Sequence, residues 1–298
     1  MFKNLIVYRI APSWDASLTA LEQALATRRF VPCGPGQEQA LGWVEPRGEA
    51  HGPLAESVGG QWVLRLMSET RVLPASVVNR AAQEQAAQIE ATTGRKVGRK
   101  ELRDLKEQAR QALLPQAFTR QSSAWVWIDP LARRLVIDSA SQSRADGVVT
   151  ELVRAIDGMG LELLPTAQTP AGCMAAWLAD GEPPAGFAID RECELKATDG
   201  SQAVVRYARH PLDTDEVRQH IAQGKQPTRL ALTWGGRVSL VLTEGLQIKK
   251  LAFLEGVFAG REAQAEEGFD TDVAIATGEL RQLLPQLLEA LGGENLPV

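Results

Sequence analysis

The sequence predicts an α+β fold, in which a body rich in antiparallel strands carries flanking helices and a protruding helical hairpin. Strand-like runs follow one another in groups with helices between the groups, and this order favours α+β over a doubly wound parallel sheet. The chain has 298 residues, of which 44% are hydrophobic, so a sizeable core is available. One Ala- and Gln-rich stretch, followed by a strongly charged one, interrupts the strands and supplies the hairpin.

The first 73 residues are expected to form strands around one helix. The run KNLIVYRI, Lys3–Ile10, is rich in β-branched and aromatic residues, which is typical of a strand. A helix follows, with Asp15 as its expected N-cap. The segments LGWVEP and QWVLRLMSET predict two more strands, separated by a loop rich in Gly and Pro around Arg47–Gly60.

Residues 74–117 are expected to form the helical hairpin. Pro74 lies near the start of the first helix, and Gly94 occupies its C-cap position. The second helix runs from about Gly98 to Leu114 and ends there, because the proline that follows cannot continue it. By its length, this pair of helices is expected to project from the sheet as an insertion.

The chain then returns to strands. AFTRQSSAWVWID and RRLVIDSA predict strands, and SRADGVVTELVRAIDGMG predicts a helix closed by glycine. Gly and Pro cluster again in ADGEPPAG, at Ala179–Gly186, which indicates a boundary between two parts of the chain.

The C-terminal part is expected to combine strands with two helices. Two alternating segments surround an Asp-Gly turn. A helix follows, with Asp213 ahead of it and Glu216 at the spacing of a capping box. Three antiparallel strands come next, with Gly235 and Gly236 as the first hairpin turn. The segment ATGELRQLLPQLLEALGG predicts the last helix.

Positive charge is concentrated in one segment of this acidic chain. Between Gly94 and Arg120 there are eight cations and three acids, a net charge of +5, whereas the whole chain carries −5. On a helix, Arg99, Arg103, Lys106 and Arg110 fall within an arc of about 60°, apart from an apolar stripe and an acidic face. Such a row binds phosphates, because each neutralised phosphate releases counterions. A solvated helix that is basic by accident is the alternative. The expected DNA contacts in this segment are Arg95, Lys96, Arg99, Lys100, Arg103, Lys106 and Arg110.

A second cationic cluster in the C-terminal half strengthens the prediction of DNA binding. The basic helix is not interleaved with aromatic residues for base stacking, and no recognition-helix motif is present. We therefore expect contact with the backbone of DNA, both duplex and single-stranded, without readout of the base sequence. The residues of this second cluster are Arg206, Arg209, His210, Lys225 and Arg229.

The sequence offers little catalytic chemistry. The three histidines have no metal-ligand partner at helical spacing, the three cysteines are scattered, and no phosphate-binding loop motif occurs. We therefore expect neither a metal nor a cofactor, and no enzymatic activity.

Two alternatives from other functional classes stay open. Asp190, Glu194 and Lys196 resemble the D…E-x-K arrangement of metal-dependent nucleases, in which acids share a cation and the lysine steadies the attacking water. A solvated strand edge is the simpler interpretation of these residues. The other alternative is a protein-interaction module without DNA affinity, whose basic helix would meet an acidic partner.

The N-terminal segment predicts a cytoplasmic protein. The apolar run before Arg9 has four residues, which is too short for the core of a signal peptide. No window of the sequence approaches 18 apolar residues, so no membrane association is expected.

Phe118 is an unusual residue for its position. If residues 117–128 form a strand, Phe118 shares a face with Arg120 and Ser122, among polar neighbours. The ring either covers the base of the hairpin or anchors a partner subunit at a dimer interface, since exposed aromatic residues favour interfaces.

Nearly the whole chain resembles one protein family. The resemblance is carried by FKNLIVYRI, FVPCG, LGWVEPRG, LPASVV, GRK, LLPQAFTR, WID, GKQPTRLALTW and the terminal TGELRQLL…LGGE, whose order and spacing are specific only together. They resemble the bacterial recombination-associated protein RdgC family. The resemblance implies a ring-shaped homodimer that binds DNA without sequence preference, associates with the nucleoid and restrains RecA-promoted strand exchange.

The resemblance also implies residue roles and a division of the chain. Phe118 matches the phenylalanine that family members place at the subunit contact. Arg209 and His210 fall where members carry a basic–polar pair associated with DNA binding, although a histidine is largely neutral at pH 7. The implied fold is a central antiparallel-rich β body with flanking helices and two protruding tips. The expected divisions are 1–73, 118–178 and 231–298 for the body, 74–117 for the helical-hairpin tip and 179–230 for a second α/β tip.

Overall fold

The computed structural model describes residues 1–15, 17–258 and 268–295, so residues 16, 259–267 and 296–298 of the expected body lie outside the described residues. The described strands are β1 (Leu5–Ile10), β2 (Gln39–Val44), β3 (Ala55–Val58), β4 (Gln61–Val72), β5 (Phe118–Asp129), β6 (Arg134–Asp138), β7 (Leu161–Leu163), β8 (Phe187–Ala197), β9 (Val204–Ala208), β10 (Lys225–Trp234), β11 (Val238–Thr243) and β12 (Ile248–Phe253). The described helices are α1 (Leu18–Ala26), α2 (Ala75–Thr93), α3 (Arg99–Leu113), α4 (Gln142–Ala155), α5 (Pro170–Asp180), α6 (Asp215–Ala222) and α7 (Gly268–Ala290), with a 3-10 turn η1 (Leu114–Gln116) after α3. The predicted α+β class is confirmed.

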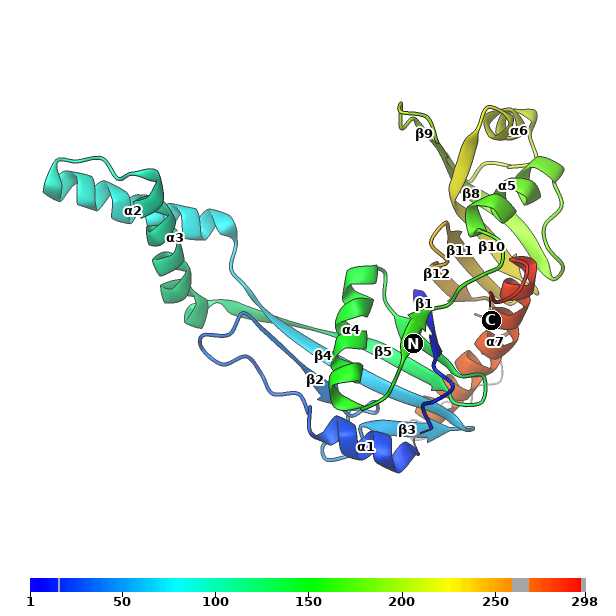
Figure 1. The fold of residues 1–298 in the computed structure, drawn as a ribbon, viewed down its shortest axis with the longest axis horizontal. Coiled ribbons are helices and arrows are strands. Elements are labelled where there is room, and N and C mark those ends of the chain that lie inside the picture. The colour runs from blue at the N-terminus through cyan, green and yellow to red at the C-terminus, as the bar shows by residue number, and fades with distance from the viewer. Residues whose placement is uncertain (16, 259–267, 296–298) are drawn as a thin grey trace.

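The strands form one sheet in which every ladder is antiparallel. Its order is β2-β4-β5-β6-β1-β12-β11-β10-β8-β9, with β3 paired to β4 and β7 paired to β1. The N-terminal strand β1 therefore lies in the middle and joins the two halves of the sheet. Figure 1 shows a molecule shaped like a crescent, with α2 and α3 at one end and β9 with α6 at the other, and both ends rise on the same side.

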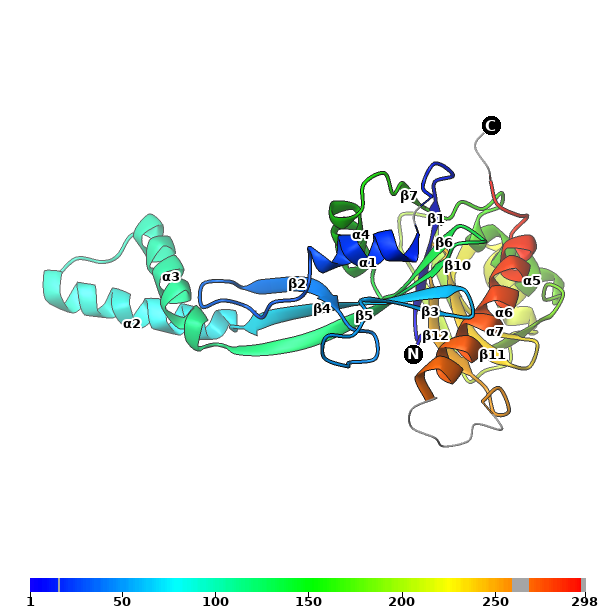
Figure 2. The ribbon, with the colours of Figure 1, turned by 90° about the horizontal axis from the view of Figure 1, so that it is seen from below.

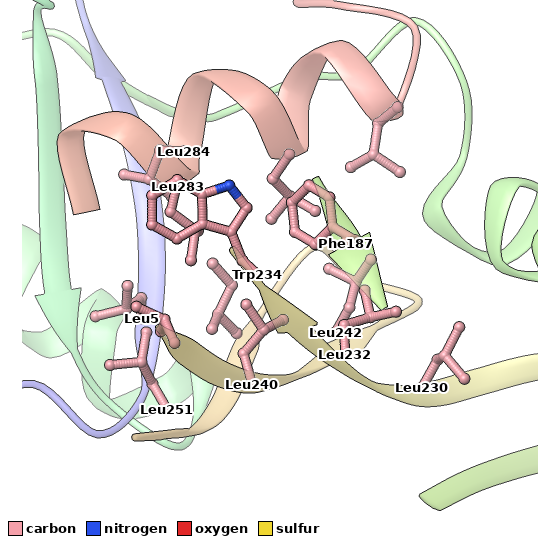
Figure 3. Close-up of a cluster of buried hydrophobic side chains, with 14 of the residues drawn as sticks. Leu5, Phe187, Leu230, Leu232, Trp234, Leu240, Leu242, Leu251, Leu283 and Leu284 are labelled. Atoms are coloured by element: carbon pink, nitrogen blue, oxygen red, sulfur yellow. The ribbon is translucent and has the colours of Figure 1, made fainter. Parts of the chain in front are cut away.

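The hydrophobic core lies on both faces of the sheet, because successive side chains of a strand point to opposite faces. On β1, Ile6 and Tyr8 pack in the cluster beneath α1 and α4, whereas Leu5 and Val7 pack in the cluster beneath α5 and α7. Figure 2 shows α1 and α4 together on one face of the strands. Figure 3 shows the other cluster, where leucines of β10 and β11 and Trp234 meet α7.

The helical hairpin forms as the sequence predicts. Gly94 ends α2 with a left-handed backbone (φ 71°), a conformation that suits glycine because it has no Cβ. The hairpin has a small core of its own, formed by Ala82, Leu105 and Ala109. Pro115 ends the α-helical hydrogen bonding of α3, and the chain passes through η1 before β5 begins.

Two predicted helix caps are wrong. The N-cap of α1 is Ser17, whose hydroxyl accepts from the Ala20 amide, and Asp15 lies two residues earlier. The N-cap of α6 is Thr214, whose hydroxyl accepts from the Val217 amide, so Asp213 does not cap the helix. Ser, Thr and Asp are all suited to the N-cap position. In both helices the hydroxyl residue, which lies closer to the first helical turn, takes it.

Three elements are missed by the sequence patterns. The short strand β3 lies in the segment expected to be a loop, β7 follows α4, and α5 precedes the expected boundary at Ala179–Gly186. The last helix also begins earlier than its apolar pattern indicates, since α7 is already helical at Gly268, the first described residue after a gap. No described helix carries an apolar run long enough to cross a bilayer.

The expected second tip, residues 179–230, continues the sheet. It contributes β8, β9 and the first part of β10, and its division from the body at residue 230 falls within β10. Its apolar side chains share one cluster with α7, as Leu195 and Leu230 do with Leu284. In Figure 1 this part nevertheless forms one end of the crescent.

Candidate nucleic-acid interface

The hairpin exposes all seven of its predicted cations. Leu105 and Ala109 turn one face of α3 toward α2, so the residues on the remaining faces of the helix point to solvent. The seven exposed residues are Arg95, Lys96, Arg99, Lys100, Arg103, Lys106 and Arg110. The hairpin therefore presents a cationic surface on a small apolar core.

Two of these cations are paired within the chain. Arg95 forms a bidentate pair with Glu101, with both nitrogen–oxygen distances at 2.7 Å, which raises the pKa of Arg95 and lowers that of Glu101 through the hydrogen bonds. Arg110 lies 2.5 Å from a carboxylate oxygen of Glu38, which precedes β2. Arg95 precedes α3, so its pair with Glu101 links the loop to the helix and leaves the predicted separation of cationic and acidic faces on α3 a prediction.

The other five hairpin cations form no ion pair in the described part of the chain. They are Lys96, Arg99, Lys100, Arg103 and Lys106. An unpaired, exposed cation keeps its full charge for a ligand, whereas a paired one must first lose its partner. These five are therefore the predicted cations most available to an anionic ligand.

Two residues of the second cationic cluster, Arg206 and Arg229, lie on the open face of the sheet. The helices α5, α6 and α7 cover one face of β8–β12 with one apolar cluster, and in Figure 1 they lie on the outer side of these strands. Arg206 and Arg229 alternate with the clustered residues Tyr207 and Leu230, so they occupy the uncovered face. No described helix packs there, and that face is on the inner side of the crescent.

Arg206 and Arg229 both lie beside Glu194. Arg206 Nε is 2.6 Å from Glu194 Oε2, and Arg229 is the ladder partner of Glu194. Hydrogen bonds from Thr228 and then from Arg206, with the charge of Arg229 adding to them, hold the pKa of Glu194 below its usual range. The three residues carry a net charge of +1, and the Arg206 side chain is 75% exposed.

The remaining predicted residues of this cluster lie apart from that pair. Lys225 is on the side of α6, where its ammonium lies 2.9 Å from His220 Nδ1. Arg209 and His210 lie in the loop after β9, where Arg209 has a positive φ of 55°. His210 Nδ1 is 2.6 Å from the Pro211 carbonyl oxygen, so this nitrogen donates the hydrogen bond.

The structure adds cations that the sequence patterns did not assign to DNA binding. Lys196 alternates with Leu195 on β8, and Lys249 lies opposite Val241, so both join the uncovered face. A shallow cavity of about 480 Å³ on this face is lined in part by Arg191, Arg209 and Lys250. The alternation of apolar residues along β8 is the readable signal for Lys196, whereas β12 does not alternate, since Ile248 and Leu251 both face the apolar cluster. Lys250 also lies 2.5 Å from Glu192, across the sheet, and no local sequence pattern predicts this contact.

Phe118 is the most exposed large hydrophobic residue among the described ones, with 87% of its surface accessible. It begins β5 directly after the hairpin, and its ladder partner is Val72, which is also exposed. The alternative in which the ring covers the base of the hairpin is therefore wrong. The role of Phe118 at a dimer interface stays a prediction.

The three nuclease-like residues share the uncovered face, but the two carboxylates already accept hydrogen bonds from other side chains of the chain. The carboxylate of Asp190 accepts a hydrogen bond from Thr233 at 2.8 Å. That of Glu194 accepts from Thr228 and Arg206 at 2.8 and 2.6 Å. Within the described residues, no group of three His, Cys, Asp or Glu side chains could hold a metal ion.

Comparison with known proteins gives consistent matches over almost the entire chain. Residues 1–294 match the family model described as "RdgC: Putative exonuclease, RdgC". Three proteins named "Recombination-associated protein RdgC" are similar to it. The one from Dechloromonas aromatica (strain RCB) is 45% identical, with 98% of each chain covered. The one from Janthinobacterium sp. (strain Marseille) is 43% identical, with 98% of each covered, and the one from Bordetella pertussis is 43% identical, with 99% of each covered.

Proposed function

The chain belongs to the RdgC family, and on that premise we propose that it binds DNA through the phosphate backbone, as a ring-shaped homodimer, and restrains RecA-promoted strand exchange. Family membership and the names of the relatives associate it with recombination. The more specific parts of the proposal rest on the charges and the shape of the molecule.

One observation carries the DNA-binding proposal. Among the described residues, five of the predicted cations are unpaired and exposed along the hairpin, and Arg206 and Arg229 lie on the uncovered sheet face at the inner side of the crescent. The chain as a whole has a charge of −5, so this concentration creates a local positive field against the overall charge. Binding of phosphates is the chemistry that such a field supports, and it needs no base contacts.

The crescent shape and Phe118 support a closed dimer. A crescent whose two ends rise on the same side can enclose an opening when a second copy meets both ends. Phe118 is at the base of the hairpin, where an exposed aromatic ring is suited to anchor a partner. A ring of this kind would hold DNA by enclosing it, with the cationic inner face toward the phosphates.

The restraint of strand exchange follows from occupancy of the DNA backbone. A recombinase needs access to the duplex along its length, and a protein that covers or encircles the duplex without sequence preference blocks that access anywhere. The blockade should therefore scale with the amount of protein per length of DNA and should not depend on the base sequence.

Sedimentation of the pure protein with and without plain duplex DNA tests this function. We expect a dimer in the absence of DNA and a faster-sedimenting complex in its presence, on duplexes of unrelated sequence. A strand-exchange reaction with RecA should slow in proportion to the added protein. A monomer that shows no DNA affinity at low salt would refute the proposal and favour a protein-interaction module.

A second candidate function is suggested by the family description, which names an exonuclease. Asp190, Glu194 and Lys196 lie on the uncovered face at which we propose DNA binding. The test is incubation of end-labelled DNA with the protein and Mg²⁺ or Mn²⁺, beside Glu194→Gln. Metal-dependent release of nucleotides that disappears in the variant would support the nuclease, and equal release by both proteins would indicate a contaminant.

A further inference from the structure

Apolar packing does not fix the direction of the hairpin. The chain crosses between sheet and hairpin twice, at Leu73–Pro74 and at residues 114–117. The small core of the hairpin is separate from the two larger clusters of the sheet. A cavity of about 300 Å³ lies at this joint, lined in part by Leu73, Val78 and Leu114. Because no continuous core of described residues spans the joint, another interaction has to set the angle between hairpin and sheet.

One side chain, that of Arg71 on β4, reaches both sides of the joint. Its Nη1 lies within hydrogen-bond distance of the carbonyl oxygens of Leu114 (3.1 Å), Pro115 (3.2 Å) and Ala117 (3.1 Å), which form the base of the hairpin. Its Nη2 reaches the carbonyl oxygens of Cys33 (3.4 Å) and Gly34 (3.2 Å) in the turn ahead of β2. A single guanidinium thus connects five backbone carbonyls of two segments.

The surroundings of Arg71 hold it in this position. The backbone amide of Arg71 donates to the Glu38 carbonyl at 2.8 Å. Glu69, two residues earlier on the same face of β4, is buried and accepts from the Cys33 amide at 2.8 Å and from Gln121 Nε2 at 2.7 Å. These contacts fix the Cys33–Gly34 turn beside the guanidinium. The nearby Arg110–Glu38 ion pair is about half exposed on both sides, so it is a weaker restraint.

We propose that Arg71 is the positioning residue that sets the direction of the cationic hairpin relative to the sheet. The planar guanidinium is suited to this role because its two terminal nitrogens form a rigid fork, one toward the hairpin base and one toward the turn. A lysine ammonium keeps the charge but is a single point, and it cannot reach both groups of carbonyls at once. The proposal rests on the proposed function for its biological meaning, since the hairpin carries the candidate DNA contacts.

The direct test is a distance distribution between hairpin and sheet. Spin labels at Ala91→Cys on α2 and Ser143→Cys on α4, both exposed positions, report the hairpin direction by pulsed electron resonance in a Cys33→Ala background. Labelled protein is diluted with unlabelled protein, so that only distances within one chain are measured. We expect a single narrow distribution for the parent and a broadened or displaced one for Arg71→Lys and Arg71→Ala.

The matched control is Arg65→Lys, at another arginine on the same face of β4. Arg65 donates to Ser123 Oγ and lies over the Trp125 ring, so these contacts stay within β4 and β5 of the sheet. This variant should keep the parental distribution. Ethylguanidinium added to Arg71→Ala should narrow the distribution again, because it can restore the fork without the covalent link.

Duplex DNA binding of the same variants separates this inference from the proposed function. Arg71→Lys keeps every candidate cation, yet we expect its affinity to fall by roughly tenfold or more, because the hairpin and the sheet no longer engage one duplex together. If the parent binds no DNA, the proposed function fails, while the distance measurement still tests the role of Arg71. An unchanged distribution in Arg71→Lys overturns the role. Loss of the far-ultraviolet circular dichroism signal in both Arg71 variants also overturns it, because Arg71 would then be needed for folding rather than for direction.

Discussion

Phe118 lies directly across from Val72 in the ladder of β4 and β5, and 87% and 48% of these two residues are exposed. Cross-strand partners share a face of the sheet, so the two side chains form one small apolar patch at the base of the hairpin. Polar residues follow on β5, from Thr119 to Ser122, all of them exposed. An isolated apolar patch in polar surroundings is the arrangement expected of a contact with another molecule.

Phe118→Ser should weaken the dimer without unfolding the monomer. A buried aromatic anchor typically contributes about 2 kcal/mol or more to an interface, which corresponds to about thirtyfold in the association constant. Analytical ultracentrifugation measures the association, and thermal melting measures the fold. Leu131→Ser is the control, because Leu131 is 82% exposed in the turn between β5 and β6, away from the hairpin. An unchanged dimer constant in Phe118→Ser would remove this residue from the interface.

The affinity for DNA should fall steeply as the salt concentration rises. If binding neutralises phosphates, the logarithm of the binding constant decreases linearly with the logarithm of salt, by about 0.9 for each duplex phosphate contacted. Exchanging the base sequence at constant length should change the affinity little, because base edges are not contacted. Fluorescence anisotropy with labelled duplexes measures both. A flat salt response, or a strong preference among sequences, would contradict backbone binding.

Replacing the five unpaired hairpin cations by glutamine should flatten the salt dependence more than replacing the two paired ones. The slope decreases by about 0.9 for each phosphate that the variant no longer neutralises. The five are Lys96, Arg99, Lys100, Arg103 and Lys106, and the paired ones are Arg95 and Arg110. Both variants should keep the dimer, because the apolar residues of α2 and α3 are unchanged. If the variant with all five replacements keeps the parental slope of binding against salt, the sheet residues Arg206 and Arg229 become the main contacts.

Acid should weaken the fold in part through Glu69. The hydrogen bond from Gln121, followed by that from the Cys33 amide, lowers the pKa of Glu69 below its usual value. The stability that this carboxylate contributes is therefore fully present above the unfolded pKa of about 4.3 and is lost as the pH falls through the lower folded pKa. Urea unfolding of the parent and of Glu69→Gln should show a stability difference that shrinks below a pH of about 4.3. A difference that stays constant into acid would contradict this assignment, and Glu84→Gln on the exposed face of α2 is the control.

The sequence is informative where the signals are local. The hairpin follows from Pro74, Gly94 and Pro115, which act on their own backbone, and the exposed cations follow from the helical period. The strand β3 is not readable in this way, because its four residues are a strand only through their pairing with β4. The helix α5 has readable signals, a Thr169 cap followed by Pro170, but its apolar composition hides the helical period.

The features that the sequence does not predict depend on contacts between distant segments. The pair of Arg110 with Glu38 and the reach of Arg71 to the Cys33–Gly34 turn depend on how the hairpin sits on the sheet. No spacing in the sequence encodes these distances. The sequence also does not show that Lys225 and Arg229 lie on opposite faces of the sheet. In β10 a register irregularity between Pro227 and Arg229 accompanies this change of face.

The hairpin is a lever whose fulcrum is at the joint near Arg71. The 19 residues of α2 span about 28 Å at about 1.5 Å per residue, so a rotation of about 10° at the joint moves the far end by about 5 Å. One nucleotide step along a DNA strand is about 3.4 Å, so that small rotation carries Lys96 and Arg99 past more than one phosphate. The reach of the molecule toward its ligand is therefore governed by angular stiffness at a single polar joint, far from the charges that would make the contact.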